Sequence, residues 1–170
     1  GIAPDNLGGR AAFRAQVARH AVSAGCALSP AEIIATSGAT ESVHLCLRAV
    51  CQPGDLIAIE SPTFFGFLQL IESLGMRAVE IPTYPRDGVC LDALAYALEH
   101  QNIKACLFVL NFANPLGSCM PDEKKARLVQ MLAERDIPLI ENDIYGSLYF
   151  GKARPRTAKS FDRHGRVLLC

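Results

Sequence analysis

The chain has 170 residues, half of them hydrophobic and a fifth charged, a composition that is typical of a globular domain and excludes an intrinsically disordered one. Its 17 acidic and 17 basic residues cancel, so we expect no surface on this segment that binds nucleic acid or a membrane by charge. No apolar run approaches the roughly 18 residues that span a bilayer, and no signal peptide opens the chain.

The first fifty residues predict two helices with a short strand between them. Residues 13–24 have the spacing of an amphipathic helix, with Phe13 on its apolar face. The segment Ser29-Pro30-Ala31-Glu32 has the spacing of a capping box, so a helical turn is expected to begin there. A strand at residues 33–36 then leads into a helix at residues 40–50.

Strands and helices alternate through the middle of the chain. A turn at Pro53-Gly54-Asp55 precedes a strand at residues 56–59. A helix at residues 63–74 is expected to end at Gly75, because glycine commonly caps the C-terminus of a helix. A strand at residues 78–81 follows.

The alternation continues to the end of the chain. Leu91, Leu94 and Leu98 share one face of a further helix. The remaining elements are strands at residues 105–110, 138–141 and 167–169 and a helix at residues 121–134. This order predicts an α/β fold over residues 1–170, with a doubly wound, mostly parallel sheet that carries helices on both faces.

The cysteines and histidines give no sign of a metal site. The seven cysteines include no Cys-x-x-Cys pair, and several, such as Cys46 and Cys106, lie in apolar runs, where a thiol behaves as a small hydrophobe. The four histidines do not cluster in the sequence. We therefore expect a reduced, cytoplasmic protein with no structural disulfide, no zinc site and no catalytic triad.

Four polar segments each follow a predicted strand, and the carboxyl ends of parallel strands meet at the edge of a sheet where ligands bind. One of them opens a helix, whose free N–H groups favour an anion. Taken singly, each segment also fits a helix cap, a hydrophobic staple or a turn. Neither GxGxxG nor a P-loop motif is present, which disfavours a dinucleotide or triphosphate site. The segments are Thr36-Ser37-Gly38-Ala39-Thr40, Ser61-Pro62-Thr63-Phe64-Phe65-Gly66, Asn114-Pro115-Leu116-Gly117 and Glu141-Asn142-Asp143-Ile144-Tyr145.

In this order, the motifs SGAT, ESPTFFG, NPLG and ENDIY resemble the large domain of the class I/II aminotransferases, the fold type I family of pyridoxal-phosphate enzymes. The resemblance covers nearly the whole chain and implies a homodimer that binds pyridoxal 5'-phosphate. It assigns the cofactor phosphate to Gly38, Ala39 and Thr40. It also implies that Phe64 stacks on the pyridine ring and that Asn114 and Tyr145 hydrogen-bond the phenolic oxygen of the ring.

The resemblance leaves the partner of the pyridine nitrogen open between two residues. Many members of the family have an acidic residue three positions before the tyrosine, where this chain has Asn142. The adjacent Asp143 carries the charge that would keep the nitrogen protonated, so Asp143 is the expected partner and Asn142 its rival.

The reacting half of the family's site is expected to lie outside this chain. The family's Schiff-base lysine lies in a Ser-x-Ser-Lys segment after the strand that residues 167–170 resemble, and none of the five lysines here has that context. The chain also begins without methionine. We therefore expect a fragment with no catalytic residue, without bound cofactor and with an exposed sheet edge that promotes association.

Three functions remain open for the complete protein. The sequences of the segments ESPTFFG and LIENDIYG resemble those of the MocR-type branch of the GntR transcriptional regulators. In that branch, an aminotransferase-like domain follows an N-terminal winged helix-turn-helix that contacts DNA. The second possibility is a free-standing aminotransferase that acts on an α-amino acid. The third is an α/β interaction domain without cofactor.

Overall fold

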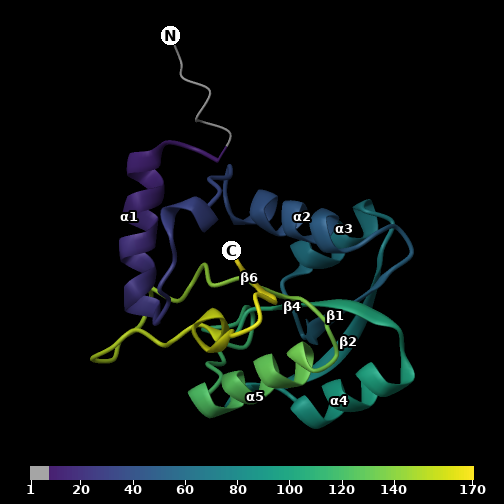
Figure 1. The fold of residues 1–170 in the computed structure, drawn as a ribbon. Helices are drawn as coiled ribbons and strands as arrows, with labels where there is room; N and C mark the ends of the chain where they lie inside the picture. Colours follow the sequence, from purple (N-terminus) through teal and green to yellow (C-terminus); the bar gives the residue numbers. More distant parts are fainter. Residues whose placement is uncertain (1–7) are drawn as a thin grey trace.

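A six-stranded sheet runs through the molecule, with helices packed on both of its faces (Figure 1). This computed structural model describes residues 8–170. The first seven residues, including the first residue, which is not methionine, lie outside the described part. The spatial order of the strands is β3-β2-β1-β4-β5-β6. The strands are β1 (Leu56–Ser61), β2 (Arg77–Tyr84), β3 (Gly88–Val89), β4 (Ile103–Phe108), β5 (Leu139–Glu141) and β6 (Val167–Leu169).

The topology confirms the predicted doubly wound sheet. Every neighbouring pair of strands is parallel except β2 and β3, which are antiparallel. The chain runs outward from β1 to β2, and later fills the other side of β1 with β4, β5 and β6. The direction of winding therefore reverses between β1 and β4, which is the point at which open α/β sheets bind ligands.

The helices form one layer on each side of the sheet. Figure 1 shows α2 and α3 over one face and α4 and α5 over the other, while α1 stands beside the sheet. The α-helices are α1 (Ala11–Ala21), α2 (Ala39–Val50), α3 (Phe65–Ser73), α4 (Leu91–His100) and α5 (Asp122–Ala133). Three short 3-10 helices are η2 (Val22–Ala24), η3 (Pro30–Glu32) and η4 (Ala158–Phe161).

Two apolar cores explain why the central strands are continuous apolar runs. Side chains alternate between the faces of a strand, and here both faces are covered. In β1, Ile57 and Ile59 pack toward α2 and α3, and Ala58 packs toward α4 and α5. In β4, Leu107 packs toward α2 and α3, and Phe108 packs toward α4 and α5.

Two local predictions are confirmed in atomic detail. At η3 the side chain of Ser29 accepts a hydrogen bond from the N–H of Ala31 at 3.3 Å, and the N–H of Ser29 donates to Glu32 Oε2 at 2.8 Å. At the end of α3, Gly75 adopts φ +69°, the left-handed conformation that suits glycine after a helix. These are short-range patterns, and for that reason the local sequence was sufficient to predict them.

Near the start of the chain, the predicted strand is wrong, and the predicted helix is confirmed with different bounds. Residues 33–36 pair with none of the described strands; instead, the N–H of Ala35 donates to the carbonyl of Gly8 at 2.9 Å. The helix predicted at residues 13–24 begins earlier and changes to a 3-10 turn after Ala21. Phe13 is 53% exposed, because α1 lies beside the sheet rather than on it (Figure 1).

Within residues 8–170, no helix combines the length and the apolar character needed to cross a membrane.

Candidate functional site

Two of the polar segments predicted from the sequence, at residues 114–117 and 141–145, meet at one edge of the sheet. Hydrogen bonds extend the ladder beyond β5 at this edge. The N–H of Asn142 donates to the carbonyl of Phe108 at 2.9 Å, and that of Asp143 donates to the carbonyl of Cys170 at 2.9 Å. The ends of β4, β5 and β6 are thereby held side by side, next to the reversal point of the sheet.

The N-terminus of α2 provides open backbone donors. Gly38 precedes the helix with φ +100°, and a Cβ added there would meet nothing within 4 Å, so the backbone is both glycine-specific and open to an approaching group. The first N–H groups of a helix have no carbonyl partner inside it, which applies here to Ala39 and Thr40. The carboxylate of Glu41 already accepts the N–H of Ser37.

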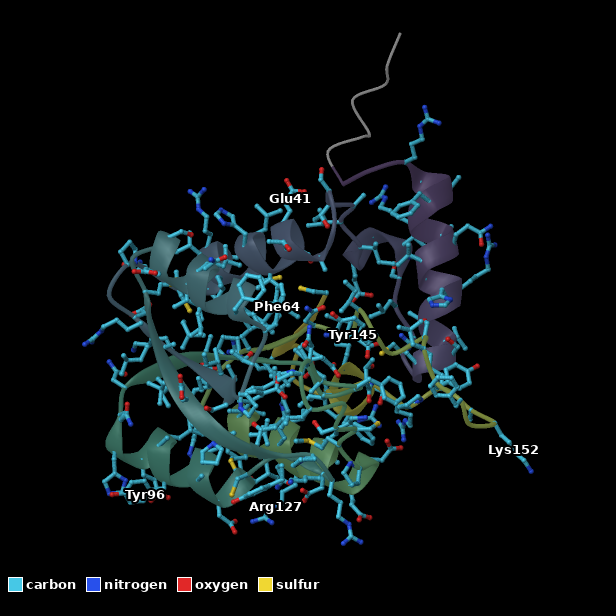
Figure 2. All side chains as sticks on the ribbon, turned by 180° about the vertical axis from the view of Figure 1, so that it is seen from behind. Glu41, Phe64, Tyr96, Arg127, Tyr145 and Lys152 are labelled. Atoms are coloured by element: carbon cyan, nitrogen blue, oxygen red, sulfur yellow. The ribbon has the colours of Figure 1, made fainter. Side chains whose placement is uncertain are left out.

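The ring of Phe64 packs over the start of α3. It lies 5.6 Å from the ring of Phe67, centroid to centroid and edge to face, and 4.9 Å from that of Phe65. Phe64 and Tyr145 both pack against the core under α2 and α3, and Figure 2 shows them on the same side of the sheet. Gly66 makes this arrangement possible, because a Cβ there would lie 2.4 Å from Phe64 Cε1.

Gly66→Ala is expected to displace the Phe64 ring and to lower the free energy of unfolding by about 1–3 kcal/mol, as overpacking does. Alanine is the better helix former by about 1 kcal/mol, which works against this loss. Urea titration measures the change. The matched control is Gly151→Ala, because a Cβ at Gly151 meets nothing within 4 Å. Equal stability of the two variants would limit the cost of displacing the ring to the roughly 1 kcal/mol that alanine adds in a helix, and would contradict a larger overpacking cost.

Asn114 and Tyr145 meet across the site although they follow different strands. The amide nitrogen of Asn114 donates to the phenolic oxygen of Tyr145 at 3.4 Å. This long bond lies beside a mostly apolar groove of about 440 Å³, to which Phe112, Leu148 and Phe150 also contribute. Phe112 has φ +56°, a conformation that non-glycine residues rarely adopt and that is found disproportionately at functional sites.

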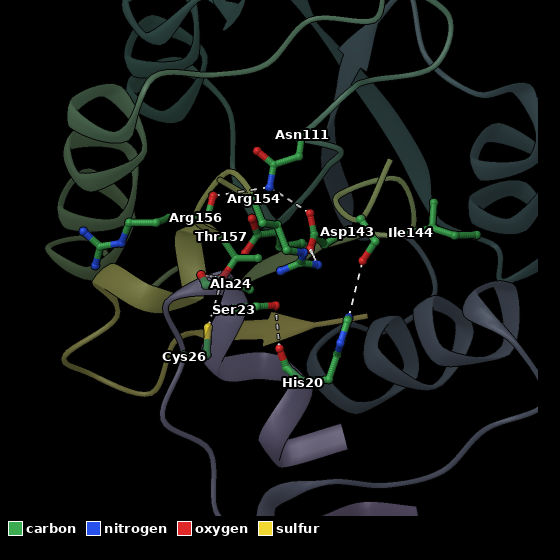
Figure 3. A network of polar contacts seen from close by, with 12 residues as sticks. His20, Ser23, Ala24, Cys26, Asn111, Asp143, Ile144, Arg154, Arg156 and Thr157 are labelled. Atoms are coloured by element: carbon green, nitrogen blue, oxygen red, sulfur yellow. Dashed lines mark hydrogen bonds and ion pairs between the residues drawn. The ribbon is translucent and has the colours of Figure 1, made fainter. Parts of the chain in front are cut away.

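Asp143 lies in a buried polar network (Figure 3). Its Oδ1 accepts a hydrogen bond from Asn111 at 2.8 Å, and its Oδ2 pairs with Arg154 Nη2 at 2.5 Å. Both carboxylate oxygens are therefore engaged. The side chain of Asn142 is also buried, and its Oδ1 accepts the N–H of Ile144 at 3.3 Å.

Lys125 completes the network and is fully buried. Its Nζ donates to Asn111 Oδ1 at 2.7 Å and to the carbonyl of Arg156 at 2.6 Å. Burial lowers the pKa of this amine, and nearby acidic groups oppose the shift in part. No sequence pattern predicted this role, because Lys125 lies in the charged run DEKK, which resembles a solvent-exposed helix face. Arg154 lies in a loop without a motif.

The other lysines are occupied away from the site or exposed. Lys124 pairs with Asp87 at 2.8 Å, and Lys159 pairs with Asp162 at 2.9 Å. Lys152 points outward from the loop between β5 and η4 in Figure 2. Among residues 8–170, no group of three or more His, Cys, Asp or Glu side chains is arranged to hold a metal ion.

Sequence comparison decides the family. The family model "Aminotransferase class I and II" matches residues 6–170. The chain belongs to the class I and II aminotransferases. Of the solved structures, the α-aminoadipate aminotransferase LysN from Thermus thermophilus, complexed with N-(5'-phosphopyridoxyl)-L-leucine, superposes with a TM-score of 0.86 and 28% identity. That match covers 98% of this chain and 42% of LysN.

This aminotransferase-family chain is also similar to proteins described as transcriptional regulators. It is 43% identical over 166 residues to the HTH-type transcriptional regulator YjiR of Escherichia coli, covering 98% of this chain. It is 31% identical over 125 residues to the 2-aminoadipate transaminase of Thermus thermophilus, covering 74% of this chain. The chain spans only 35% of YjiR and 31% of the transaminase.

Proposed function

We propose that this chain is the cofactor-binding part of the effector domain of a MocR-type regulator in the GntR family. The observation that carries the proposal is the 43% identity to YjiR over nearly the whole chain, together with 43% identity over 162 residues to a second E. coli HTH-type regulator, YdcR. In the complete cytoplasmic protein, an N-terminal winged helix-turn-helix would contact DNA. A small C-terminal domain and a second subunit would complete the effector pocket, which would accept an amino-acid-like molecule.

The residues of the site fit pyridoxal phosphate. The open backbone at Gly38, the N–H groups of Ala39 and Thr40 and the hydroxyl of Thr40 would hold the phosphate, because a helix N-terminus stabilises an anion. The Phe64 ring would cover one face of the pyridine. The hydrogen bond between Asn114 and Tyr145, which is 3.4 Å long, would open. Both side chains would then bond to the phenolic oxygen of the cofactor's pyridine ring.

When bound, the cofactor supplies an aldehyde that reacts with amines and a ring that withdraws electrons. The residues of this chain bind and orient it. Asp143 remains a candidate partner of the pyridine nitrogen, but it would have to share a carboxylate that Asn111 and Arg154 already hold. Asn142 would offer only a neutral amide there. If Asp143 holds the nitrogen, Asp143→Asn changes the absorbance and affinity of the bound cofactor in the complete protein, and Asn142→Ala does not.

Asn114→Ala is expected to weaken the binding of pyridoxal phosphate to the complete protein about three- to tenfold, the loss of one hydrogen bond of roughly 0.5–1.5 kcal/mol. Titration of cofactor absorbance against protein concentration measures the affinity. Asn102→Ala is the matched control, because Asn102 is exposed in the connection between α4 and β4. Unchanged affinity in Asn114→Ala would remove Asn114 from the site.

A free-standing aminotransferase is the second candidate, favoured by the 31% identity to the 2-aminoadipate transaminase. The complete gene product separates the two. A regulator would bind DNA from its own promoter region in a fluorescence-anisotropy titration and show the absorbance of pyridoxal phosphate. An enzyme would transfer amino groups between amino and 2-oxo acids and leave the DNA unbound. A protein without cofactor absorbance would refute both and support a plain interaction domain.

A further inference from the structure

Two thiols from distant parts of the chain meet beside the candidate site. Cys46 lies in α2, and Cys170 follows β6. Their Sγ atoms are 3.6 Å apart, although 124 positions separate the two residues in the sequence. Within residues 8–170, which include all seven cysteines, this is the one pair of thiols in hydrogen-bond contact.

The two thiols are accessible and chemically unequal. Both are partly exposed, whereas Cys26, Cys51 and Cys106 are buried. The hydrogen bond with Cys170 lowers the pKa of the Cys46 thiol, and burial opposes this in part. The same hydrogen bond, with burial, raises the pKa of Cys170. Because the thiolate is the nucleophile, Cys46 is the thiol that reacts first.

We propose that Cys46 and Cys170 form an oxidation site, at which a peroxide converts the two thiols into a disulfide. The Cys46 thiolate attacks one peroxide oxygen, the O–O bond breaks, and the departing hydroxide takes up the proton that Cys46 released, which gives water and a sulfenic acid. The Cys170 sulfur then attacks the Cys46 sulfur. The S–O bond breaks, and its hydroxyl leaves with the Cys170 proton as a second water. The sulfurs supply the two electrons that reduce the peroxide.

The geometry suits this second step. A disulfide has an S–S distance of about 2.05 Å, so the sulfurs must approach by only about 1.5 Å, which rotation of the side chains can supply. This oxidation uses only the two thiols and a peroxide and does not require the cofactor. The proposal therefore does not depend on the function proposed above.

Oxidation would join two elements of the candidate site. The N–H of Cys170 donates to the carbonyl of Glu141 at 2.8 Å, and its carbonyl accepts the N–H of Asp143 at 2.9 Å. Cys170 is thus fixed to the segment that carries Asn142 and Tyr145. A disulfide to Cys46 would tie this segment to α2, whose N-terminus begins at Gly38.

Peptide mapping tests the proposal on the complete gene product. The native protein is treated with hydrogen peroxide, its remaining thiols are blocked with N-ethylmaleimide, and it is digested without reduction by trypsin and a glutamate-specific protease. Cleavage after Glu41, Arg48 and Arg166 gives peptide 42–48, in which Cys46 is the one cysteine, and a peptide that begins at Val167. We expect these two peptides to be linked, with a mass lower by two hydrogen atoms than their sum, and to separate on reduction with dithiothreitol.

The controls separate this pair from general oxidation. Cys46→Ser and Cys170→Ser should each abolish the linked peptide, whereas Cys90→Ser, which removes another partly exposed thiol, should leave it in place. A mixture of ¹⁵N-labelled and unlabelled protein tests whether the link lies within one chain. In each linked pair, both peptides should then be labelled or both unlabelled. The proposal is overturned if wild-type Cys46 and Cys170 both stay free, if either links to another cysteine, or if the link joins two copies of the chain.

Discussion

Asp143→Ala is expected to lower the free energy of unfolding by about 3–5 kcal/mol, because it leaves a buried charge without its partner. The side chains of Arg154 and Asp143 are only 9% and 5% exposed, so water cannot replace the lost ion pair. Arg154 is already short of partners, since its Nε and Nη1 atoms are buried without a hydrogen bond within the described chain. The amide of Asn111 would lose an acceptor as well. Urea unfolding followed by circular dichroism measures the loss.

Two further variants make this prediction specific. Asp92→Ala removes the partner of Arg127 in an exposed ion pair, with side chains 89% and 66% exposed, and should cost about 1 kcal/mol or less. The double variant Asp143→Leu with Arg154→Met removes both buried charges and should recover most of the stability. If the double variant were as unstable as Asp143→Ala, the unpaired charge would not be the cause.

Glu60→Gln is expected to stabilise the protein at pH 8.5 relative to the wild type and to leave it nearly unchanged at pH 5. Glu60 is 2% exposed at the end of β1. Its Oε2 accepts the N–H of Val109 at 2.8 Å, and its Oε1 has no partner among the described residues. Burial raises the pKa of this carboxyl to about 8 from 4.5, and the hydrogen bond from Val109 lowers it in part.

The sign follows from proton binding. Between pH 4.5 and pH 8 the folded state keeps a proton on Glu60 that the unfolded state has lost, so stability falls as the pH rises through this window. The total loss for Glu60 is on the order of 3–5 kcal/mol. Glutamine resembles the neutral acid and does not titrate. The fall in stability that comes from Glu60 should therefore be absent from Glu60→Gln.

Urea titrations of both proteins at pH 5 and pH 8.5 measure the difference. Some pH dependence will persist in Glu60→Gln, because burial also raises the pKa of Glu141 to about 7. Glu72→Gln, at an exposed position of α3, is the matched control and should keep the full pH dependence. If the free energy of unfolding changed equally with pH in the wild type and in Glu60→Gln, the raised pKa of Glu60 would be contradicted.

The sequence was most informative where short-range patterns decide the structure. Apolar runs with two buried faces predicted β1 and β4, and the helical spacing of Leu91, Leu94 and Leu98 predicted α4. The segments at residues 61–66, 114–117 and 141–145 follow β1, β4 and β5 in the chain, and the carboxyl ends of parallel strands meet at one edge of a sheet. Their order also indicated the family that the match over residues 6–170 shows.

The errors and omissions arose where a residue's environment comes from far along the chain. Residues 33–36 have the composition of a strand, but no described strand lies beside them to accept the pairing. Phe13 has the spacing of a core residue, but it is exposed on α1, which lies beside the sheet. Lys125 resembles a surface charge in the sequence, yet it is fully buried.

The sequence by itself therefore determined the alternation of strands and helices, the family and the segments that form the candidate site. Only the tertiary structure decided how the side chains in those segments are used. It engaged both oxygens of Asp143 with Asn111 and Arg154, joined Asn114 to Tyr145, and brought Cys46 within 3.6 Å of Cys170. The physical reason is range: periodicity and turn chemistry act over a few residues, whereas ion pairs, buried hydrogen bonds and thiol contacts depend on which distant segments the packed sheet places side by side.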